Sequence, residues 1–324
     1  MSETLFKKYN VPVPRYTSYP TANSFGPFDE TDYLKALETS NDATADNISF
    51  YIHVPFCRHL CHYCGCNSVA MAKPDRITEY FETLHKEIDL LLPHLRKDRR
   101  ISQIHYGGGS PSSMPLHFIR SINEHLLSAF ETIDRPEIAI ECHPGYLKEE
   151  DWHYLLDSGF NRFSLGIQDF NDEVLRCVNR QPALLPVETI MKILREGGAK
   201  VNFDFIYGLP KQSVSAFVST IKKAISLRPD RLVTFSYAHL PSLFKRQMIL
   251  EKAGLPSQNE KLKMFEEATK TLQAAGYVPI GMDHFVLPDD DLSVALQHHT
   301  LHRNFQGYCP RRITEQVYAF GVSG

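Results

Sequence analysis

Four of the seven cysteines in this chain lie within ten consecutive residues. Cys57, Cys61 and Cys64 form a C-x3-C-x2-C pattern, and Cys66 follows two residues later. Thiolates bind zinc, copper(I) and the iron of iron–sulfur clusters, which are soft or borderline metals. Structural zinc usually takes two separated pairs of ligands, and no second C-x2-C pair follows downstream. Three cysteines on one compact loop therefore favour a four-iron cluster whose fourth iron is open to another ligand.

Other interpretations of this loop stay open. Zinc could be held by the cysteines together with a histidine, or the loop could be a redox site. The candidate histidines lie in or beside the loop, at His53, His59 and His62. Cys66 is a weaker candidate ligand, because the other three cysteines already suffice for a cluster.

The composition limits the class of protein. The chain has 324 residues, is 43% hydrophobic and 23% charged, and carries a formal charge of -3, as in an ordinary globular protein. The nearly balanced charge provides no positive surface potential of the kind that attracts nucleic acid. No apolar run approaches the ~20 residues that span a bilayer. The N-terminus lacks the order of a secretory signal. We therefore expect a cytoplasmic protein, in which clustered thiols serve as ligands and not as disulfides.

Apolar runs typical of buried strands alternate with stretches of helical spacing. The predicted strands cover residues 48–54, 101–107, 137–142, 162–168, 201–208 and 231–240. Helical stretches lie between them at 76–95, 117–130, 149–159, 186–198 and 213–229. This alternation predicts βαβ units and a parallel sheet, either as a barrel or as an open sheet. In both, functional groups gather at the carboxyl ends of the strands, where the cysteine loop lies.

Glycine and polar residues end the next strands. The sequence GGGSP at 107–111 ends the second strand, where glycines allow close backbone approach to a ligand or simply a tight turn. Glu141 ends the third strand and Gln168 the fourth. Burying such a side chain without a partner costs roughly 2–7 kcal/mol. A bound polar ligand would supply that partner, and structural hydrogen bonding is the alternative.

The motifs together resemble one family of enzymes. C-x3-C-x2-C after the first strand of a β/α repeat is similar to the radical S-adenosylmethionine (SAM) superfamily. Within it, the chain resembles the oxygen-independent coproporphyrinogen III oxidases from its N-terminal arm to its last residue. The strings that carry this resemblance are YIHVPFCRHLCHYCGCN, HYGGGSPS, GIQDFNDEVLRCVNR, FDFIYGLPKQ, YAHLP, IGMDHF and LHRNFQGY. The resemblance implies an α/β fold, a partial (β/α)6 radical SAM barrel with parallel strands.

The resemblance also implies cofactors and their ligands. Cys57, Cys61 and Cys64 would hold a 4Fe-4S cluster whose open iron binds SAM. Two SAM molecules are expected, the second nearer Gln168, Arg180, Asp204 and Ala238. The full set of implied SAM contacts is Tyr51, Tyr63, Gly108, Gly109, Ser110, Glu141, Gln168, Arg180, Asp204 and Ala238. For each of these residues alone, a structural role is the alternative, because ion pairs also lie at strand ends.

The implied reaction is the oxidative decarboxylation of coproporphyrinogen III to protoporphyrinogen IX by way of a 5′-deoxyadenosyl radical, in anaerobic haem biosynthesis. An electron donor such as flavodoxin or ferredoxin would be needed, and we expect a monomer. Arg15 and Arg303 could bind the propionates of the substrate, because guanidinium pairs with carboxylate. His284 has no assigned role. The alternative functions are a related haem chaperone and a zinc-binding interaction module.

The resemblance sets expectations for the domains as well. Residues 1–45 would form an arm that packs on a catalytic domain at 46–324, and the arm's PRYTSYPT would help to close the site. Members of this family continue into a helical domain beyond the point where this chain ends, at YAFGVSG. We therefore expect the C-terminal helical domain to be missing, and turnover by these 324 residues to be weak or absent.

Overall fold

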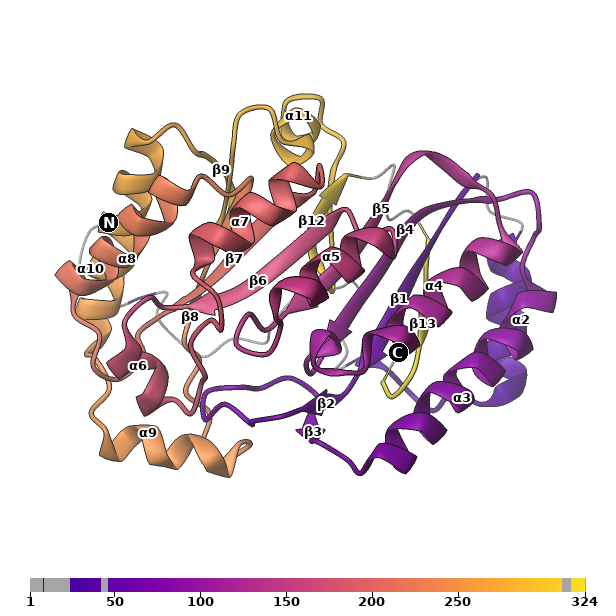
Figure 1. Cartoon of the computed structure of the whole chain (residues 1–324), viewed down its shortest axis with the longest axis horizontal. Helices are drawn as coiled ribbons and strands as arrows, with labels where there is room; N and C mark the ends of the chain where they lie inside the picture. Colours follow the sequence, from indigo (N-terminus) through magenta and orange to yellow (C-terminus); the bar gives the residue numbers. More distant parts are fainter. Residues whose placement is uncertain (1–7, 9–23, 42–45, 311–315, 324) are drawn as a thin grey trace.

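The computed structural model describes Lys8 and residues 24–41, 46–310 and 316–323 (Figure 1). Its centre is a nine-stranded sheet in the order β13-β1-β4-β5-β6-β7-β8-β10-β9. Neighbours from β13 to β8 are parallel, while β10 pairs antiparallel with both β8 and β9. The bounds of the parallel strands are β13 Val317–Phe320, β1 Asn47–Val54, β4 Arg100–Gly108, β5 Thr132–Cys142, β6 Arg162–Gln168, β7 Lys200–Tyr207 and β8 Arg231–Ser236.

All six predicted strands are confirmed, as β1 and β4 to β8. Their apolar runs are continuous because both faces of the sheet are covered. Along β1, for example, Ile48, Ser49 and Phe50 are buried in succession, whereas β7 buries alternate residues. The order of paired strands in the described part of the chain runs from β13 to β9 without closing, so the parallel strands form part of a barrel, as predicted.

Helices cover the outer face of the sheet. In Figure 1, α3, α4, α5 and α7 lie side by side in front of the strands, and α8 and α10 continue the row. Five of these helices correspond to the five predicted helical stretches, and their bounds are α3 Pro74–Leu91, α4 Leu116–Ala129, α5 Glu149–Asp157, α7 Val187–Glu196 and α8 Val214–Leu227. Helix α7 shows the local reason: it begins after Pro186 and buries Val187, Ile190 and Leu194 at helical spacing.

Several elements were not predicted from the sequence. They are the helices α2 Glu30–Asn41, α6 Asp172–Cys177, α9 Met248–Lys252, α10 Gln258–Ala274 and α11 Asp291–Gln297, and the strands β9 Val278–Gly281, β10 His284–Val286, β11 Leu301–Asn304 and β12 Gly307–Pro310. Strand β13, close to the end of the chain, pairs in parallel with β1. None of the described helices has the length and apolar character needed to cross a bilayer.

The N-terminal arm is described only in part. Arg15 and the sequence PRYTSYPT lie outside the described residues, so the expectations for them stay predictions. Helix α2 packs Leu37 into the main core, and the Ser40 hydroxyl lies 2.6 Å from the hydroxyl of Tyr318 on β13. The division at residue 45 likewise stays a prediction.

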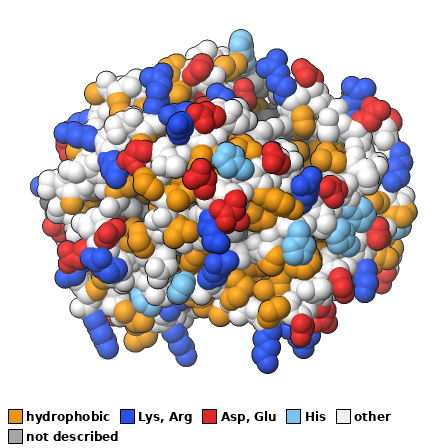
Figure 2. Space-filling view, viewed as in Figure 1, with side chains coloured by type: hydrophobic (Ala, Val, Ile, Leu, Met, Phe, Trp, Pro, Cys, Tyr) orange, Lys and Arg blue, Asp and Glu red, His pale blue; other side chains and the backbone are white. Residues whose placement is uncertain are grey.

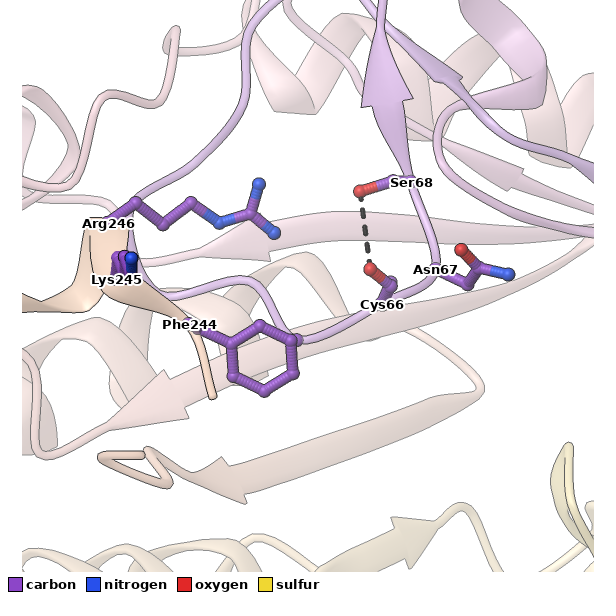
Figure 3. Close-up of a pocket in the computed structure, with 7 residues that line it drawn as sticks. Cys66, Asn67, Ser68, Phe244, Lys245 and Arg246 are labelled. Carbon is purple, nitrogen blue, oxygen red and sulfur yellow. Dashed lines mark hydrogen bonds between the residues drawn. The ribbon is translucent and has the colours of Figure 1, made fainter. Parts of the chain in front are cut away.

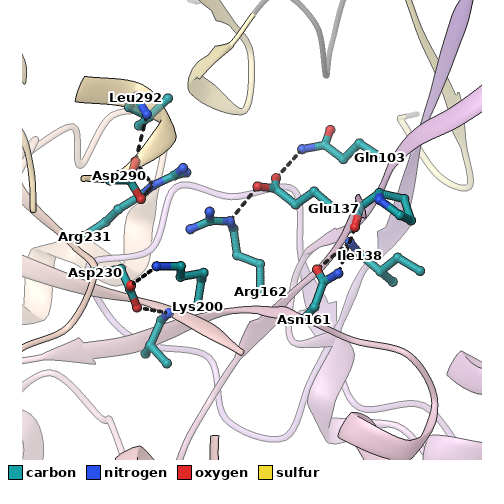
Figure 4. Close-up of polar contacts among 12 residues, drawn as sticks. Gln103, Glu137, Ile138, Asn161, Arg162, Lys200, Asp230, Arg231, Asp290 and Leu292 are labelled. Carbon is teal, nitrogen blue, oxygen red and sulfur yellow. Dashed lines mark hydrogen bonds and ion pairs between the residues drawn. The ribbon is translucent and has the colours of Figure 1, made fainter. Parts of the chain in front are cut away.

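A buried ionic network lies at the amino-terminal side of the strands (Figure 4). Arg162, the first residue of β6, donates from Nε to Oε2 of Glu137 on β5 at 2.5 Å. Gln103 donates from Nε2 to the other oxygen of that carboxylate at 2.7 Å. Arg231, the first residue of β8, donates from Nε to both oxygens of Asp290 at 2.9 Å. The network ties neighbouring strands together on the side away from the cysteine loop.

Candidate active site

The cysteine loop leaves β1 at the carboxyl edge of the sheet. Its ends are held together by a short parallel pair, β2 Phe56–Cys57 and β3 Val69–Ala70. The amide of Val69 donates to the carbonyl of Pro55 at 2.9 Å, and the amide of Met71 donates to that of Cys57 at 2.9 Å. In Figure 1 this loop lies beside α6 and α9 along the lower edge of the molecule. The loop is thus a closed excursion from the end of the first strand, as expected.

The cysteines of the loop carry free thiols that lie close to one another. Cys61 is buried, Cys57 and Cys64 are half-buried, and Cys66 is exposed. Burial raises the pKa of the Cys57 thiol to about 11, and the neighbouring Cys64 and Cys61 add to that shift. Hydrogen bonding from Cys66 lowers the pKa of Cys64 to about 6. The backbone amide of Cys66 donates to Cys64 Sγ at 3.4 Å.

The chemistry of this donor set fits an iron–sulfur cluster. Three soft thiols come from one loop, and Arg180 donates from Nη1 toward Cys61 Sγ at 3.6 Å. Within the described residues, no three His, Cys, Asp or Glu side chains already stand in positions that would hold a metal ion.

A distant segment fixes the backbone of the cysteine loop. Arg246 donates from Nη2 to the carbonyl of Cys64 at 2.7 Å, and Gln247 donates from Nε2 to that of Tyr63 at 3.0 Å. Gln247 also donates to the carbonyl of Ala238 at 3.3 Å. Nothing in the sequence indicated these contacts, because their acceptors are backbone carbonyls that every residue possesses. A hollow of about 520 Å³ lies between residues 65–68 and 244–246 (Figure 3).

The glycine turn after β4 packs against the start of the cysteine loop. Gly108 has φ +110°, and a Cβ there would lie 2.7 Å from the ring of His53. A Cβ on Gly109 would overlap the carbonyl of Pro55, whereas its amide donates to Val54 at 2.8 Å. The amide of Ser110 donates to the carbonyl of Phe56 at 3.0 Å. Packing alone thus explains these glycines, and SAM contact at Gly108, Gly109 and Ser110 stays a prediction.

Tyr51 on β1 and Glu141 on β5 lie on either side of the intervening strand β4. His105 joins them: its ring stacks on Tyr51 with centroids 5.9 Å apart, and its Nε2 lies 3.4 Å from Glu141 Oε1. The Glu141 side chain is 45% exposed, so solvent and not a buried partner satisfies much of it. Burial raises the pKa of the Tyr51 hydroxyl, and the Glu141 carboxylate adds to the rise.

Gln168 and Arg180 form a second group at the end of β6. Gln168 is a non-glycine residue at φ +68°, and within the described chain its buried Oε1 has no hydrogen-bond partner. Arg180 donates from Nη2 to the carbonyl of Gly166 and from Nη1 to the Tyr63 hydroxyl, the latter at 3.3 Å. Arg180 therefore links β6 to the cysteine loop, and the unpaired Gln168 oxygen is free to accept from a ligand.

Asp204 has structural partners already. Its carboxylate accepts from Ser164 Oγ at 2.6 Å and from Asn202 Nδ2 at 2.9 Å. Burial raises the pKa of Asp204. The structural alternative is therefore well supported for Asp204, whereas the position of Gln168 points to a ligand.

Two residues at the site were not predicted from the sequence, His143 and Phe305. His143 follows β5, is buried, and stacks on Tyr146 with centroids 4.1 Å apart. Burial lowers the pKa of His143 to about 2, and the charge of Arg180 adds to the shift, so the imidazole is neutral. The sequence could have indicated His143 as a site residue, because it lies just beyond the carboxyl end of a predicted strand. Phe305, at the tip of the β11–β12 hairpin, meets the ring of Tyr51 edge-on at 5.0 Å, and nothing in the sequence indicated this contact.

Arg303 and His284 lie near this hairpin. The guanidinium of Arg303 lies over the ring of Tyr308 at 5.4 Å. His284 Nδ1 lies 2.7 Å from Asp283 Oδ1, and its ring meets Tyr308 edge-on at 5.0 Å. Binding of a propionate by Arg303 stays a prediction.

The partial barrel and the three-cysteine loop at its carboxyl edge define a radical SAM enzyme. In agreement, the radical SAM superfamily matches residues 51–224. More narrowly, the chain belongs to the family of oxygen-independent coproporphyrinogen III oxidases. The relative from Salmonella typhimurium that bears this name is 41% identical over 321 residues, which cover 98% of this chain and 69% of the relative. The relative from Pseudomonas aeruginosa is 42% identical over 314 residues, covering 94% of this chain and 67% of the relative.

A solved structure agrees with this assignment. The coproporphyrinogen III oxidase of Escherichia coli, described as a radical SAM enzyme, superimposes with a TM-score of 0.89 at 38% identity. The match covers 99% of this chain and 72% of that chain. Radical SAM enzymes use a 4Fe-4S cluster and SAM, so the cofactors implied by the motifs are confirmed at the level of the family.

Proposed function

We propose that this chain carries out the oxygen-independent oxidative decarboxylation of coproporphyrinogen III to protoporphyrinogen IX. The observation that carries the proposal is the match to the Salmonella oxidase over 98% of this chain, on a fold with a TM-score of 0.89 to the Escherichia coli oxidase. The reaction converts two propionates of the substrate to vinyl groups with loss of carbon dioxide. When bound, the cluster and SAM supply the one-electron chemistry that removes hydrogen from a propionate β-carbon.

The roles of the chain's own residues follow from their positions. Cys57, Cys61 and Cys64 hold the cluster, and Arg180 stabilises the thiolate of Cys61 through its N–H at 3.6 Å. The unpaired Oε1 of Gln168 accepts from a SAM donor, at a point where an unsatisfied buried oxygen would otherwise be costly. Tyr51 and Phe305 provide an apolar wall that excludes water.

The remaining predicted contacts belong to the same proposal. Gly108, Gly109 and Ser110 present the backbone of a turn that lies against the cysteine loop. Glu141 offers a half-exposed carboxylate for a cationic group such as the SAM amine. Ala238 joins the site through Gln247, which also holds Tyr63. A second SAM molecule would lie nearer Gln168, Arg180, Asp204 and Ala238.

The proposal includes a protein electron donor, such as a flavodoxin or a ferredoxin, and a monomer in the cytoplasm. These parts of the proposal are supported by the resemblance of the motifs to the family. Gel filtration of the anaerobically reconstituted protein checks the monomer, which should elute at the position expected for 37.1 kDa.

An anaerobic assay tests the proposed function. The protein is incubated with SAM, dithionite and coproporphyrinogen III, and 5′-deoxyadenosine and the vinyl product are measured separately. Because turnover by these 324 residues is expected to be weak or absent, the enzyme is used in excess over the substrate, and we expect both products within a single turnover, with 5′-deoxyadenosine formation stimulated by the porphyrinogen. Formation of 5′-deoxyadenosine without vinyl product, at any ratio of enzyme to substrate, would overturn the assignment of the substrate. Formation of neither would overturn the radical SAM reaction itself.

A further inference from the structure

The segment from Leu240 to Ile249 lies directly on the cysteine loop. Arg246 and Gln247 donate to carbonyls of the loop at 2.7 and 3.0 Å. The ring of Phe244 lies against Gly65, where a Cβ would come within 3.3 Å of it. In Figure 3, Phe244 and Arg246 approach the hollow from one side, and Cys66 and Ser68 line the other. Any molecule that contacts this segment is therefore adjacent to the residues that hold the cluster.

The outer side of the 240–249 segment is unusually apolar for a surface. Its exposed large apolar side chains are Leu240, Leu243, Met248 and Ile249, with Leu243 71% exposed. These four side chains lie within ten residues of the chain, beside the cysteine loop, whereas a second such group in the described residues, Phe25, Phe28 and Tyr33, lies in and before α2. A concentrated apolar surface of this kind usually marks a contact with another molecule.

The charge around the cysteine loop is opposite in sign to that of the whole chain. Residues 55–70 and 238–252 contain the basic residues Arg58, Lys245, Arg246 and Lys252 and one acidic residue, Glu251, which pairs with His239, although the chain carries a net charge of -3. Basic side chains project along the lower edge of the molecule in Figure 2, the edge at which α9 lies in Figure 1. An apolar surface with a basic rim matches an acidic protein partner.

We propose that the 240–249 segment is the docking surface for an acidic one-electron carrier protein that reduces the cluster. The inference rests on the proposed function, because that function requires an electron at the cluster. Lys245 attracts the carrier and Leu243, Met248 and Ile249 make the apolar contact. The carrier gives up one electron, for example as a flavin hydroquinone becomes a semiquinone, and the cluster takes up that electron.

The test compares a protein donor with a small one. The reconstituted protein is mixed anaerobically with reduced flavodoxin or with dithionite, and reduction of the cluster is followed by its absorbance. For Lys245→Glu combined with Leu243→Ser, we expect the second-order rate with flavodoxin to fall about tenfold or more at low salt, and the rate with dithionite to stay unchanged. We also expect the flavodoxin rate of the double variant to depend less on salt concentration than that of the unmodified protein. Lys222→Glu, on the exposed side of α8, is the matched control and should leave both rates unchanged.

A second measurement needs no turnover. Binding of oxidised flavodoxin, measured by titration calorimetry, should weaken by a similar factor in the double variant and not in the control. Unchanged flavodoxin rates and affinity in the double variant would overturn the docking proposal. The docking proposal would also be overturned if the unmodified protein associated with itself and the double variant did not, because a second copy would then occupy this surface. Failure of dithionite to reduce any cluster would instead overturn the proposed function, and the docking proposal with it.

Discussion

The buried carboxylate of Glu137 gives the most quantitative prediction. Burial by itself would raise its pKa, but the charges of Arg162 and Arg231 outweigh this effect and lower the pKa from 4.5 to about 2. The side chains of Glu137 and Arg162 are only 14% and 11% exposed, so solvent screens the pair weakly. This lowering of the pKa corresponds to about 3 kcal/mol of stability. We therefore expect Glu137→Gln to lower the free energy of unfolding by about 3 kcal/mol at pH 7.

The pH dependence of this loss separates charge from shape. Because the pKa of Glu137 is lower in the folded state than in the unfolded state, its stabilisation is complete above about pH 4.5 and is lost as the pH falls toward 2. The difference between the unmodified protein and the variant should therefore shrink to about half by pH 3. The Glu137→Gln variant would keep a hydrogen bond at this position, since Gln103 can turn its unpaired Oε1 toward the new amide.

Urea unfolding followed by circular dichroism between pH 7 and pH 3 measures both effects. Glu131→Gln is the matched control, because Glu131 lies 3.8 Å from Arg100 in a pair that is exposed on both sides. It should change the free energy of unfolding by less than about 0.5 kcal/mol. A loss below about 1 kcal/mol at pH 7 for Glu137→Gln, or a loss that does not diminish by pH 3, would refute the reasoning.

Three further predictions concern the cysteine loop. Gly109→Ala places a methyl group on the carbonyl of Pro55, so we expect a loss of about 1–3 kcal/mol in urea unfolding and a lower iron content after reconstitution. Gly26→Ala, with open space around its Cβ, is the control and should change neither. Arg180→Met removes a charged donor from Cys61 and Tyr63, and SAM affinity, read from the change SAM makes in the spectrum of the cluster, should fall by about ten-fold or more; unchanged affinity would give Arg180 a purely structural role. Cys66→Ser should bind iron like the unmodified protein and Cys64→Ser should not, and equal iron loss in the two would make Cys66 a ligand.

The fold was predictable where the chain is buried on both sides. Strand β1 is recognised in the sequence because both of its faces are covered, so that Ile48, Ser49 and Phe50 are buried in succession. Strand β7 is recognised by alternation, with Phe203 and Phe205 buried on one face. The pair β9 and β10 has only four and three residues, too short for any periodicity to be recognised. Helix α10 buries only Met264, Ala268 and Leu272, so its pattern is weak.

The site was predictable to the extent that it depends on strand ends. The cysteine loop follows β1, while Glu141 and Gln168 lie at the carboxyl ends of β5 and β6, and a parallel sheet brings such positions to one edge. Contacts between side chains and backbone carbonyls were not predictable. An example is the hydrogen bond from Arg246 to the carbonyl of Cys64, 182 residues away in the chain. Phe305 reaches Tyr51 from a hairpin whose position depends on tertiary packing, so no local pattern could place it.

One spectroscopic measurement tests the central claim most directly, that Cys57, Cys61 and Cys64 bind a cluster with one iron open to SAM. The anaerobically reconstituted protein is reduced with dithionite, and its electron paramagnetic resonance spectrum is recorded with and without SAM. We expect about four irons per chain and a spectrum that changes when SAM is added. Protein that binds only zinc, or an iron centre whose spectrum is the same with and without SAM, would contradict the account.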